Sequence, residues 1–172
     1  MRPEQPFKWS SGWNSPIYCD NRVTLSFPHI RSYIKQQLAE LIRQNFPEAE
    51  AIAGVATAGI AQGALVADLL EMPFLYVRPQ PKSHGMANQI EGKLISGQKV
   101  VMVEDLISTG GSSLKAAEAV RSAGGVVIGM AAIFTYGFNL ADENFKEAGI
   151  PLHCLSDYQA LTEAAMQNGY IP

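Results

Sequence analysis

The sequence has few cysteines, no long apolar run and no excess of basic residues, and each shortage excludes a class of protein. Its 172 residues include two cysteines, Cys19 and Cys154. Two are too few for a disulfide framework, so we expect the protein to reside in the reducing cytoplasm. No apolar run approaches the roughly 18 residues of a membrane span, and the N-terminus lacks the apolar segment of a signal peptide. The formal net charge of −3 argues against a nucleic-acid partner, which usually needs a basic excess.

Apolar residues make up 47% of the chain, enough for one substantial core. Because no repeat or linker interrupts the pattern, we predict a single domain over residues 1–172. The first 25 residues, with their Pro, Gly, Ser and aromatic side chains, predict irregular structure or short strands. Ser26 is the expected cap of a helix that has Pro28 in its first turn, an i, i+3, i+4 apolar stripe and an end at Pro47.

After this helix the sequence alternates between short apolar runs and amphipathic segments. Strands are expected at 51–57, 73–79, 99–103, 126–136 and 152–156. Helices are expected at 59–71, 114–123 and 139–149, with one more at the end of the chain. Such a pattern is typical of the α/β class, with a mostly parallel central sheet flanked by helices. Ligands of these sheets bind beyond the carboxyl ends of the strands.

The segment EDLISTGGSS (104–113) joins two acids to hydroxyl and glycine residues at a helix start. Backbone N–H groups in a glycine-permitted turn at a helix N-terminus form a cradle for phosphate. The carboxylates of Glu104 and Asp105 would repel that phosphate unless a sugar or a cation lay between them. Ribose hydroxyls and Mg²⁺ both suit carboxylate oxygens. The plainer alternative is a helix-capping turn with exposed acids.

A second candidate segment, RPQPKSHGMANQIEGKLISGQ (78–98), connects two strands without any apolar period. So long a connection is usually functional or disordered. Its cations Arg78, Lys82 and His84 suit a polyanion such as pyrophosphate, and its glycines permit the movement of a lid. The plainer alternative is a solvated hairpin whose charges have no role.

EDLISTGGSS resembles the phosphoribosyl-pyrophosphate (PRPP) motif of type I phosphoribosyltransferases. Within that family, the 78–98 segment is similar to the catalytic loop of orotate phosphoribosyltransferases. SGWNSPIYCDNR (11–22) and GVATAGIAQGALVA (54–67) also resemble those enzymes, on the base side and the pyrophosphate side. The resemblance covers nearly the whole chain with its motifs in order. It implies the type I phosphoribosyltransferase fold, with residues 1–25 as a small hood over the base pocket.

The resemblance implies transfer of ribose 5-phosphate from PRPP to orotate, giving orotidine 5′-monophosphate and pyrophosphate, with Mg²⁺ held through PRPP. It implies catalytic roles for Lys82, Glu104 and Asp105, and orotate contacts from Ser108 and Tyr18. It also implies a homodimer in which the 78–93 loop is shared between subunits. The implied PRPP-binding residues are Arg78, Lys82, His84, Glu104, Asp105, Leu106, Ile107, Ser108, Thr109, Gly110, Gly111 and Ser112.

The sequence departs from some family members at positions that hold cations. Pro79, Ser10 and the Thr57–Ala58 pair stand where those members have a basic residue, a lysine and a tyrosine–lysine pair. Members also usually carry a helix ahead of the segment matching Pro3 to Phe7. Two alternative functions stay open: phosphoribosyl transfer to another nucleobase, and a PRPP-sensing regulator that binds without turnover.

Overall fold

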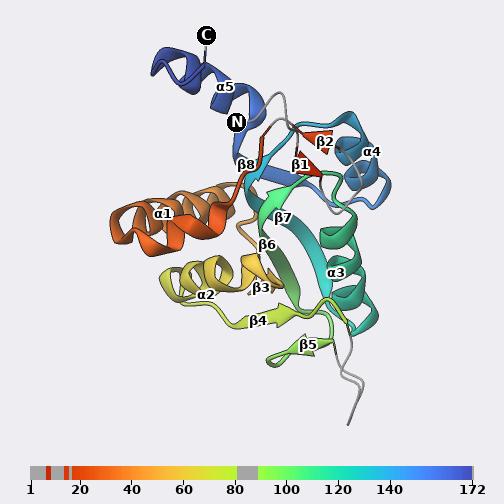
Figure 1. Ribbon diagram of the computed structural model, residues 1–172. Helices are drawn as coiled ribbons and strands as arrows, with labels where there is room; N and C mark the ends of the chain where they lie inside the picture. Colours follow the sequence, from red (N-terminus) through yellow and green to blue (C-terminus); the bar gives the residue numbers. More distant parts are fainter. Residues whose placement is uncertain (1–6, 9–13, 16, 81–88, 172) are drawn as a thin grey trace.

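A six-stranded sheet forms the centre of the computed structural model, which describes residues 7–8, 14–15, 17–80 and 89–171 (Figure 1). The strand order is β5-β4-β3-β6-β7-β8. The strands are β3 (Ala51–Val55), β4 (Phe74–Val77), β5 (Ile90–Glu91), β6 (Lys99–Ile107), β7 (Val126–Thr135) and β8 (Leu152–Asp157). All pairings are parallel except that of β5 with β4. The predicted α/β class with a mostly parallel sheet is confirmed.

Two helices cover each face of the sheet (Figure 1). Helices α1 (Pro28–Asn45) and α2 (Ala58–Leu70) lie on one face, and α3 (Gly111–Ser122) and α4 (Asn139–Glu147) lie on the other. Successive residues of β6 alternate between these layers, as a strand requires. Val101 and Val103 pack in the α1–α2 core, whereas Val100 and Met102 pack in the α3–α4 core. The sheet is therefore apolar on both faces.

The last helix, α5 (Tyr158–Gln167), extends away from the sheet and buries none of its side chains (Figure 1). It follows β8 directly and begins with the carboxylate of Asp157 accepting the Ala160 N–H at 2.8 Å. Within the described residues, no helix is long and apolar enough to cross a membrane.

The third predicted strand is longer than the sequence indicated. It was expected at 99–103, but β6 continues to Ile107 because its pairing with β7 runs on to the Ile107–Thr135 pair. The following helix begins at Gly111, not at 114. Glu104 and Asp105 therefore lie inside a strand, and only residues 108–110 separate it from the helix.

The predicted cap at Ser26 is wrong. That residue ends a short 3-10 helix, η1 (Asn21–Ser26), and α1 begins at Pro28 after Phe27 with no side-chain cap. The fixed φ of proline suits a first helical turn. The predicted end holds, because α1 ends before Pro47. Of the predicted stripe, Ile34, Leu38 and Ile42 are buried, whereas Ile30 and Tyr33 are exposed. The helix also buries Ala39.

Strand β5 was not predicted, because two residues are too few to show a pattern. It lies inside the 78–98 connection and pairs with β4 through Val77–Ile90 and Tyr76–Glu91. The Arg78 N–H donates to the Gln89 carbonyl at 2.8 Å, and the Gln89 side chain donates to the Arg78 carbonyl at 2.8 Å. The two ends of the connection are thus held together.

The described part of residues 1–25 contains two short strands, as the composition predicted. Strands β1 (Phe7–Lys8) and β2 (Asn14–Ser15) form an antiparallel pair. Ile17 then packs with Phe134 and Tyr136 near the carboxyl end of β7. This packing attaches the N-terminal segment to the edge of the sheet at which ligands are expected. The organisation of residues 1–172 as one domain stays a prediction.

Candidate active site

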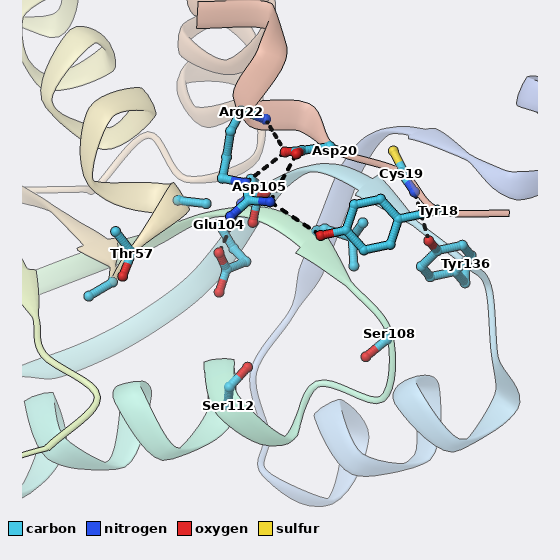
Figure 2. Close-up of a pocket in the computed structure, with 13 residues that line it drawn as sticks. Tyr18, Cys19, Asp20, Arg22, Thr57, Glu104, Asp105, Ser108, Ser112 and Tyr136 are labelled. Carbon is cyan, nitrogen blue, oxygen red and sulfur yellow. Dashed lines mark hydrogen bonds and ion pairs between the residues drawn. The ribbon is translucent and has the colours of Figure 1, made fainter. Parts of the chain in front are cut away.

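A pocket of about 450 Å³ lies at the carboxyl ends of β3 and β6 (Figure 2). Its described lining comes from the segment before α1, the β3–α2 loop, the β6–α3 region and the end of β7. This is the edge of the sheet that the parallel topology predicts for a ligand. The lining residues are Tyr18, Cys19, Asp20, Arg22, Ala56, Thr57, Ala58, Glu104, Asp105, Leu106, Ser108, Ser112 and Tyr136.

Glu104 is buried at the floor of this pocket, with 6% of its surface exposed. One carboxylate oxygen accepts the Asp105 N–H at 3.0 Å, and the other accepts the hydroxyl of Ser113, itself 1% exposed, at 3.0 Å. Burial raises the pKa of Glu104 well above that of an ordinary carboxyl, and the charge of Asp105 adds to this, although both hydrogen bonds oppose it. Donors from a bound sugar would favour its ionised form.

Asp105 follows in the strand and is held from the N-terminal segment. The side-chain amide of Asn21, 9% exposed, donates to the Asp105 carbonyl at 2.7 Å. The Asn21 amide oxygen in turn accepts the thiol of Cys19 at 3.4 Å. The segment that begins α1 and the strand that carries the acids are therefore fixed to each other.

The turn from Ser108 to Gly111 is held from behind by α4. Gly110 has a φ of +80°, and a Cβ there would lie 2.6 Å from the Phe145 ring. The Asn144 side chain donates to the Thr109 carbonyl at 2.9 Å. Helix α3 begins without a side-chain cap, so its first N–H groups are available to an anion. The alternative of a helix-capping turn is not supported.

The opposite side of the pocket is formed by residues 18–22. The Arg22 guanidinium donates to the Asp20 carboxylate through Nε at 2.6 Å and through Nη2 at 2.9 Å, and to the Tyr18 hydroxyl at 3.2 Å. Hydrogen bonds to Arg22 lower the pKa of Asp20, and the pairing with Asp20 raises the pKa of Arg22. In Figure 2, Glu104 and Asp105 lie between Arg22 and Ser112.

Tyr136 closes the pocket at the end of β7. Its hydroxyl accepts the Cys19 N–H at 3.4 Å, and its ring is stacked on Phe138 with centroids 5.8 Å apart. Burial, with the nearby Asp105 and Asp20 charges, raises the pKa of the Cys19 thiol to about 11. The thiol is therefore protonated at neutral pH and is poorly suited to act as a nucleophile.

Of the thirteen predicted site residues, the structure brings six to the pocket. Those that line it are Tyr18, Glu104, Asp105, Leu106, Ser108 and Ser112. Ile107 is fully buried in the α3–α4 core, and Thr109, Gly110 and Gly111 form the turn without lining the described pocket. Arg78 lies outside the described lining and pairs with Glu91 at 3.6 Å. Lys82 and His84 lie outside the described residues.

Ser113, expected as a hydroxyl donor of the phosphate cradle, donates to Glu104 instead. The site residues that were not predicted include Asp20, Asn21, Arg22 and Tyr136. The first three fall inside the early motif, so a residue-by-residue reading of that motif would have included them. Tyr136 carries no such signal. The Asn21–Asp105 bond joins residues 84 positions apart, a contact that only the fold reveals.

The sequence matches the phosphoribosyl transferase domain family over residues 24–150. The orotate phosphoribosyltransferase of Cytophaga hutchinsonii is 62% identical over 171 residues, covering 99% of this chain and 82% of that protein. The Bacillus subtilis orotate phosphoribosyltransferase is 54% identical, covering 99% and 79%. The crystal structure of orotate phosphoribosyltransferase from Aeropyrum pernix matches with a TM-score of 0.84 at 31% identity, covering 100% of this chain and 93% of that one.

Proposed function

This chain belongs to the phosphoribosyltransferase family, and from its orotate-enzyme relatives we propose that it transfers ribose 5-phosphate from PRPP to orotate, forming orotidine 5′-monophosphate and pyrophosphate. This reaction places it in pyrimidine biosynthesis. One observation carries the proposal. The buried Glu104, the adjacent Asp105 and the uncapped start of α3 meet in one pocket at the carboxyl edge of the sheet.

These residues divide the binding of PRPP between them. The uncapped N-terminus of α3 and the hydroxyls of Ser108 and Ser112 suit the 5-phosphate. Glu104 and Asp105 suit the ribose hydroxyls, which donate to carboxylates. Cleavage at the anomeric carbon gives a transition state of oxocarbenium character, which these two acids would stabilise by their negative charge. The protein then contributes position and electrostatics rather than a covalent intermediate.

The donor set of the pocket fits Mg²⁺ when part of its shell comes from PRPP. Carboxylate oxygens are ligands that Mg²⁺ prefers, and it usually binds with substrate phosphates rather than in an all-protein cage. Within the described residues, no group of three acidic, histidine or cysteine side chains is placed to hold a metal ion. We assign the ion to PRPP, with Asp105 as the nearby carboxylate; when bound, it neutralises charge on the pyrophosphate.

The pyrophosphate would lie on the β3–α2 side of the pocket. Residues 56–58 line it there at the start of α2, whose N-cap position has no side-chain hydrogen bond. Arg78 lies at the base of the 78–98 connection, and Lys82 and His84 complete the predicted cluster of cations. Their charges would stabilise the leaving pyrophosphate, and closure of the loop would exclude water from the reacting carbon. These roles stay predictions.

We also propose that the chain acts as a homodimer through the start of α1. Large apolar side chains are exposed there, immediately after the pocket segment, and a second copy would cover them. Their exposed fractions are 54% for Val23, 47% for Phe27, 37% for Ile30 and 63% for Tyr33. Sedimentation should show a dimer for the unmodified chain and a monomer for Tyr33→Glu. A Tyr33→Glu dimer would place the interface elsewhere.

The shared 78–93 loop has a separate test by complementation. Lys82→Ala and a Glu104→Ala/Asp105→Ala double variant should each be nearly inactive. If the loop enters the partner's site, co-expression of the two will produce mixed dimers with one intact site and recover up to roughly a quarter of the activity. No recovery in mixed dimers would show that each loop serves its own subunit.

The catalytic proposal is tested by mixing the protein with PRPP, Mg²⁺ and one base at a time. We expect the ultraviolet absorbance of orotate to fall while equimolar pyrophosphate is released, with no comparable change for uracil, adenine or hypoxanthine. Turnover of another base alone would favour the first alternative function. Binding of PRPP without turnover of any base would favour the regulator.

Both cysteines are free, which supports our expectation that the protein resides in a reducing cytoplasm.

A further inference from the structure

Orotate differs from uracil by a ring carboxylate, and the pocket proposed for it contains an excess of acidic side chains. Three of its described lining residues are acids: Asp20, Glu104 and Asp105. The one cation among the described lining residues is Arg22. An anionic base therefore enters a site whose carboxylates repel it, and it requires a cationic partner there.

We propose that Arg22 binds the carboxylate of the base and sets the specificity of this enzyme for an anionic pyrimidine. The inference rests on the proposed function, because it takes orotate as the second substrate. It assigns to Arg22 a contact for which the sequence motifs supplied no residue, since only Ser108 and Tyr18 were expected to contact orotate.

The geometry of the guanidinium supports this role. Asp20 engages Nε and Nη2, and Tyr18 accepts from Nη2. An arginine has five N–H donors, and no described contact uses Nη1. Because the Asp20 carboxylate accepts from two donors at once, it fixes the orientation of the guanidinium plane. The Nη1 donors remain for the carboxylate of the base. Asp20 thus acts as a positioning residue for Arg22.

Arg22 is less well placed for the 5-phosphate of PRPP. The uncapped start of α3 and Ser112 lie on the far side of Glu104 and Asp105 from Arg22 (Figure 2). A phosphate beside Arg22 would also face the carboxylate of Asp20. A planar monoanion such as the orotate carboxylate brings less charge to that position, so the base is the better match.

The experiment compares Arg22→Gln with the unmodified enzyme, using Arg43→Gln as the control on the exposed surface of α1. We expect Arg22→Gln to raise the KM for orotate by roughly 30-fold or more, because charge-assisted hydrogen bonds are lost. PRPP affinity, measured by calorimetry with Mg²⁺, should change by less than about twofold, and the preference for orotate over uracil should narrow. Arg43→Gln should match the unmodified enzyme.

An orotate KM within about threefold of the unmodified value would overturn the inference, and so would an equal loss of PRPP affinity. Arg22→Lys is a second variant that keeps the positive charge but loses the paired N–H donors of the planar guanidinium, and it should give an intermediate KM for orotate. Should Arg22→Gln fail to fold, an unchanged orotate KM in Arg22→Lys would count against a guanidinium contact with the carboxylate. If the unmodified chain does not use orotate at all, the proposed function fails; if it does and Arg22→Gln keeps its KM, only this inference fails.

Discussion

The two sides of the pocket are built differently. The phosphate side, Glu104 to Ser113, is anchored in the protein core at both ends: Glu104 and Ser113 expose 6% and 1% of their surfaces, and a glycine and an asparagine fix the turn between them. The base side, residues 18–22, is more open, with Tyr18 56% exposed and the Arg22 side chain 56% exposed. Its contacts are mostly hydrogen bonds among near neighbours in the chain.

This difference teaches which properties each side can control. Changes at the buried polar residues of the phosphate side, Glu104 and Ser113, should affect both PRPP binding and stability. Changes at Tyr18 and Arg22, the exposed residues of the base side, should affect orotate recognition with little loss of stability. The 78–98 connection, which was predicted to move as a lid and to bind pyrophosphate, belongs to neither side.

The largest effect is expected for Lys82→Ala, because this lysine would stabilise charge on the leaving pyrophosphate. Turnover should fall by roughly 100- to 1,000-fold, while both KM values change little. Steady-state kinetics with orotate and PRPP measure this, with Lys93→Ala as the control. A near-normal kcat in Lys82→Ala would show that this lysine has no catalytic role and that the two sides of the pocket suffice for turnover.

Asp105→Asn should come next, because it removes a charged acceptor from the ribose hydroxyls. We expect PRPP affinity to fall roughly 10- to 100-fold, with an unchanged melting temperature because Asp105 is only half-buried. Calorimetry with PRPP and Mg²⁺ measures the affinity, and Asp142→Asn on the surface of α4 is the control. An unchanged affinity of Asp105→Asn for PRPP would show that Asp105 does not contact the ribose hydroxyls.

Glu104→Gln should separate activity from stability through pH. The pKa of Glu104 is raised in the folded protein above 4.5, its ordinary value in the unfolded chain. Above pH 4.5 the unfolded carboxyl loses its proton first, so the folded state binds more protons and the free energy of unfolding falls as pH rises toward the folded pKa. Glutamine cannot ionise and should abolish this loss.

We therefore expect Glu104→Gln to be more stable than the unmodified protein at neutral pH, and less active. The advantage should shrink as pH falls to 4.5. Urea unfolding at several pH values measures it, and Glu118→Gln, exposed on α3, is the control. A Glu104→Gln protein that is less stable at every pH would show that the carboxylate is ionised and well satisfied in the free enzyme.

Asn21→Ala should have the smallest effect of the four, because Asn21 acts on Asp105 only through its backbone carbonyl. The KM for PRPP should rise roughly 3- to 10-fold, in line with one hydrogen bond, and kcat should change less. Asn45→Ala is matched, since Asn45 also donates to a backbone carbonyl, that of Leu41 at 2.8 Å, but on the surface of α1. Equal kinetics for the two variants would make the Asn21 bond purely structural.

The fold could be predicted from the sequence wherever a segment was long and periodic. The buried stripe of α1 and the apolar runs of β3, β6 and β7 gave the α/β class correctly. The errors came where tertiary pairing extends an element, as in β6 beyond 103, or where a short turn competes with a cap, as at Ser26. Strand β5 exists only because its two residues find β4.

The site was predicted in the same uneven way. EDLISTGGSS carries its chemistry in contiguous residues, so the acids, hydroxyls and glycines of the phosphate side could be identified directly. The base side depends on which side chain turns toward which partner across the fold. Arg22 and Asn21 both lie in the motif at 11–22. Only the structure shows that Arg22 donates to Asp20 and that Asn21 donates to the Asp105 carbonyl.

The central claim, that the two sides of the pocket serve two different substrates, is tested most directly by a crossed comparison of Asp105→Asn and Arg22→Gln. PRPP affinity and the KM for orotate would be measured for both variants in the same buffer. We predict that Asp105→Asn weakens PRPP binding at nearly constant orotate KM, and that Arg22→Gln does the reverse. If both variants weaken the same substrate to the same degree, the division of the pocket is wrong.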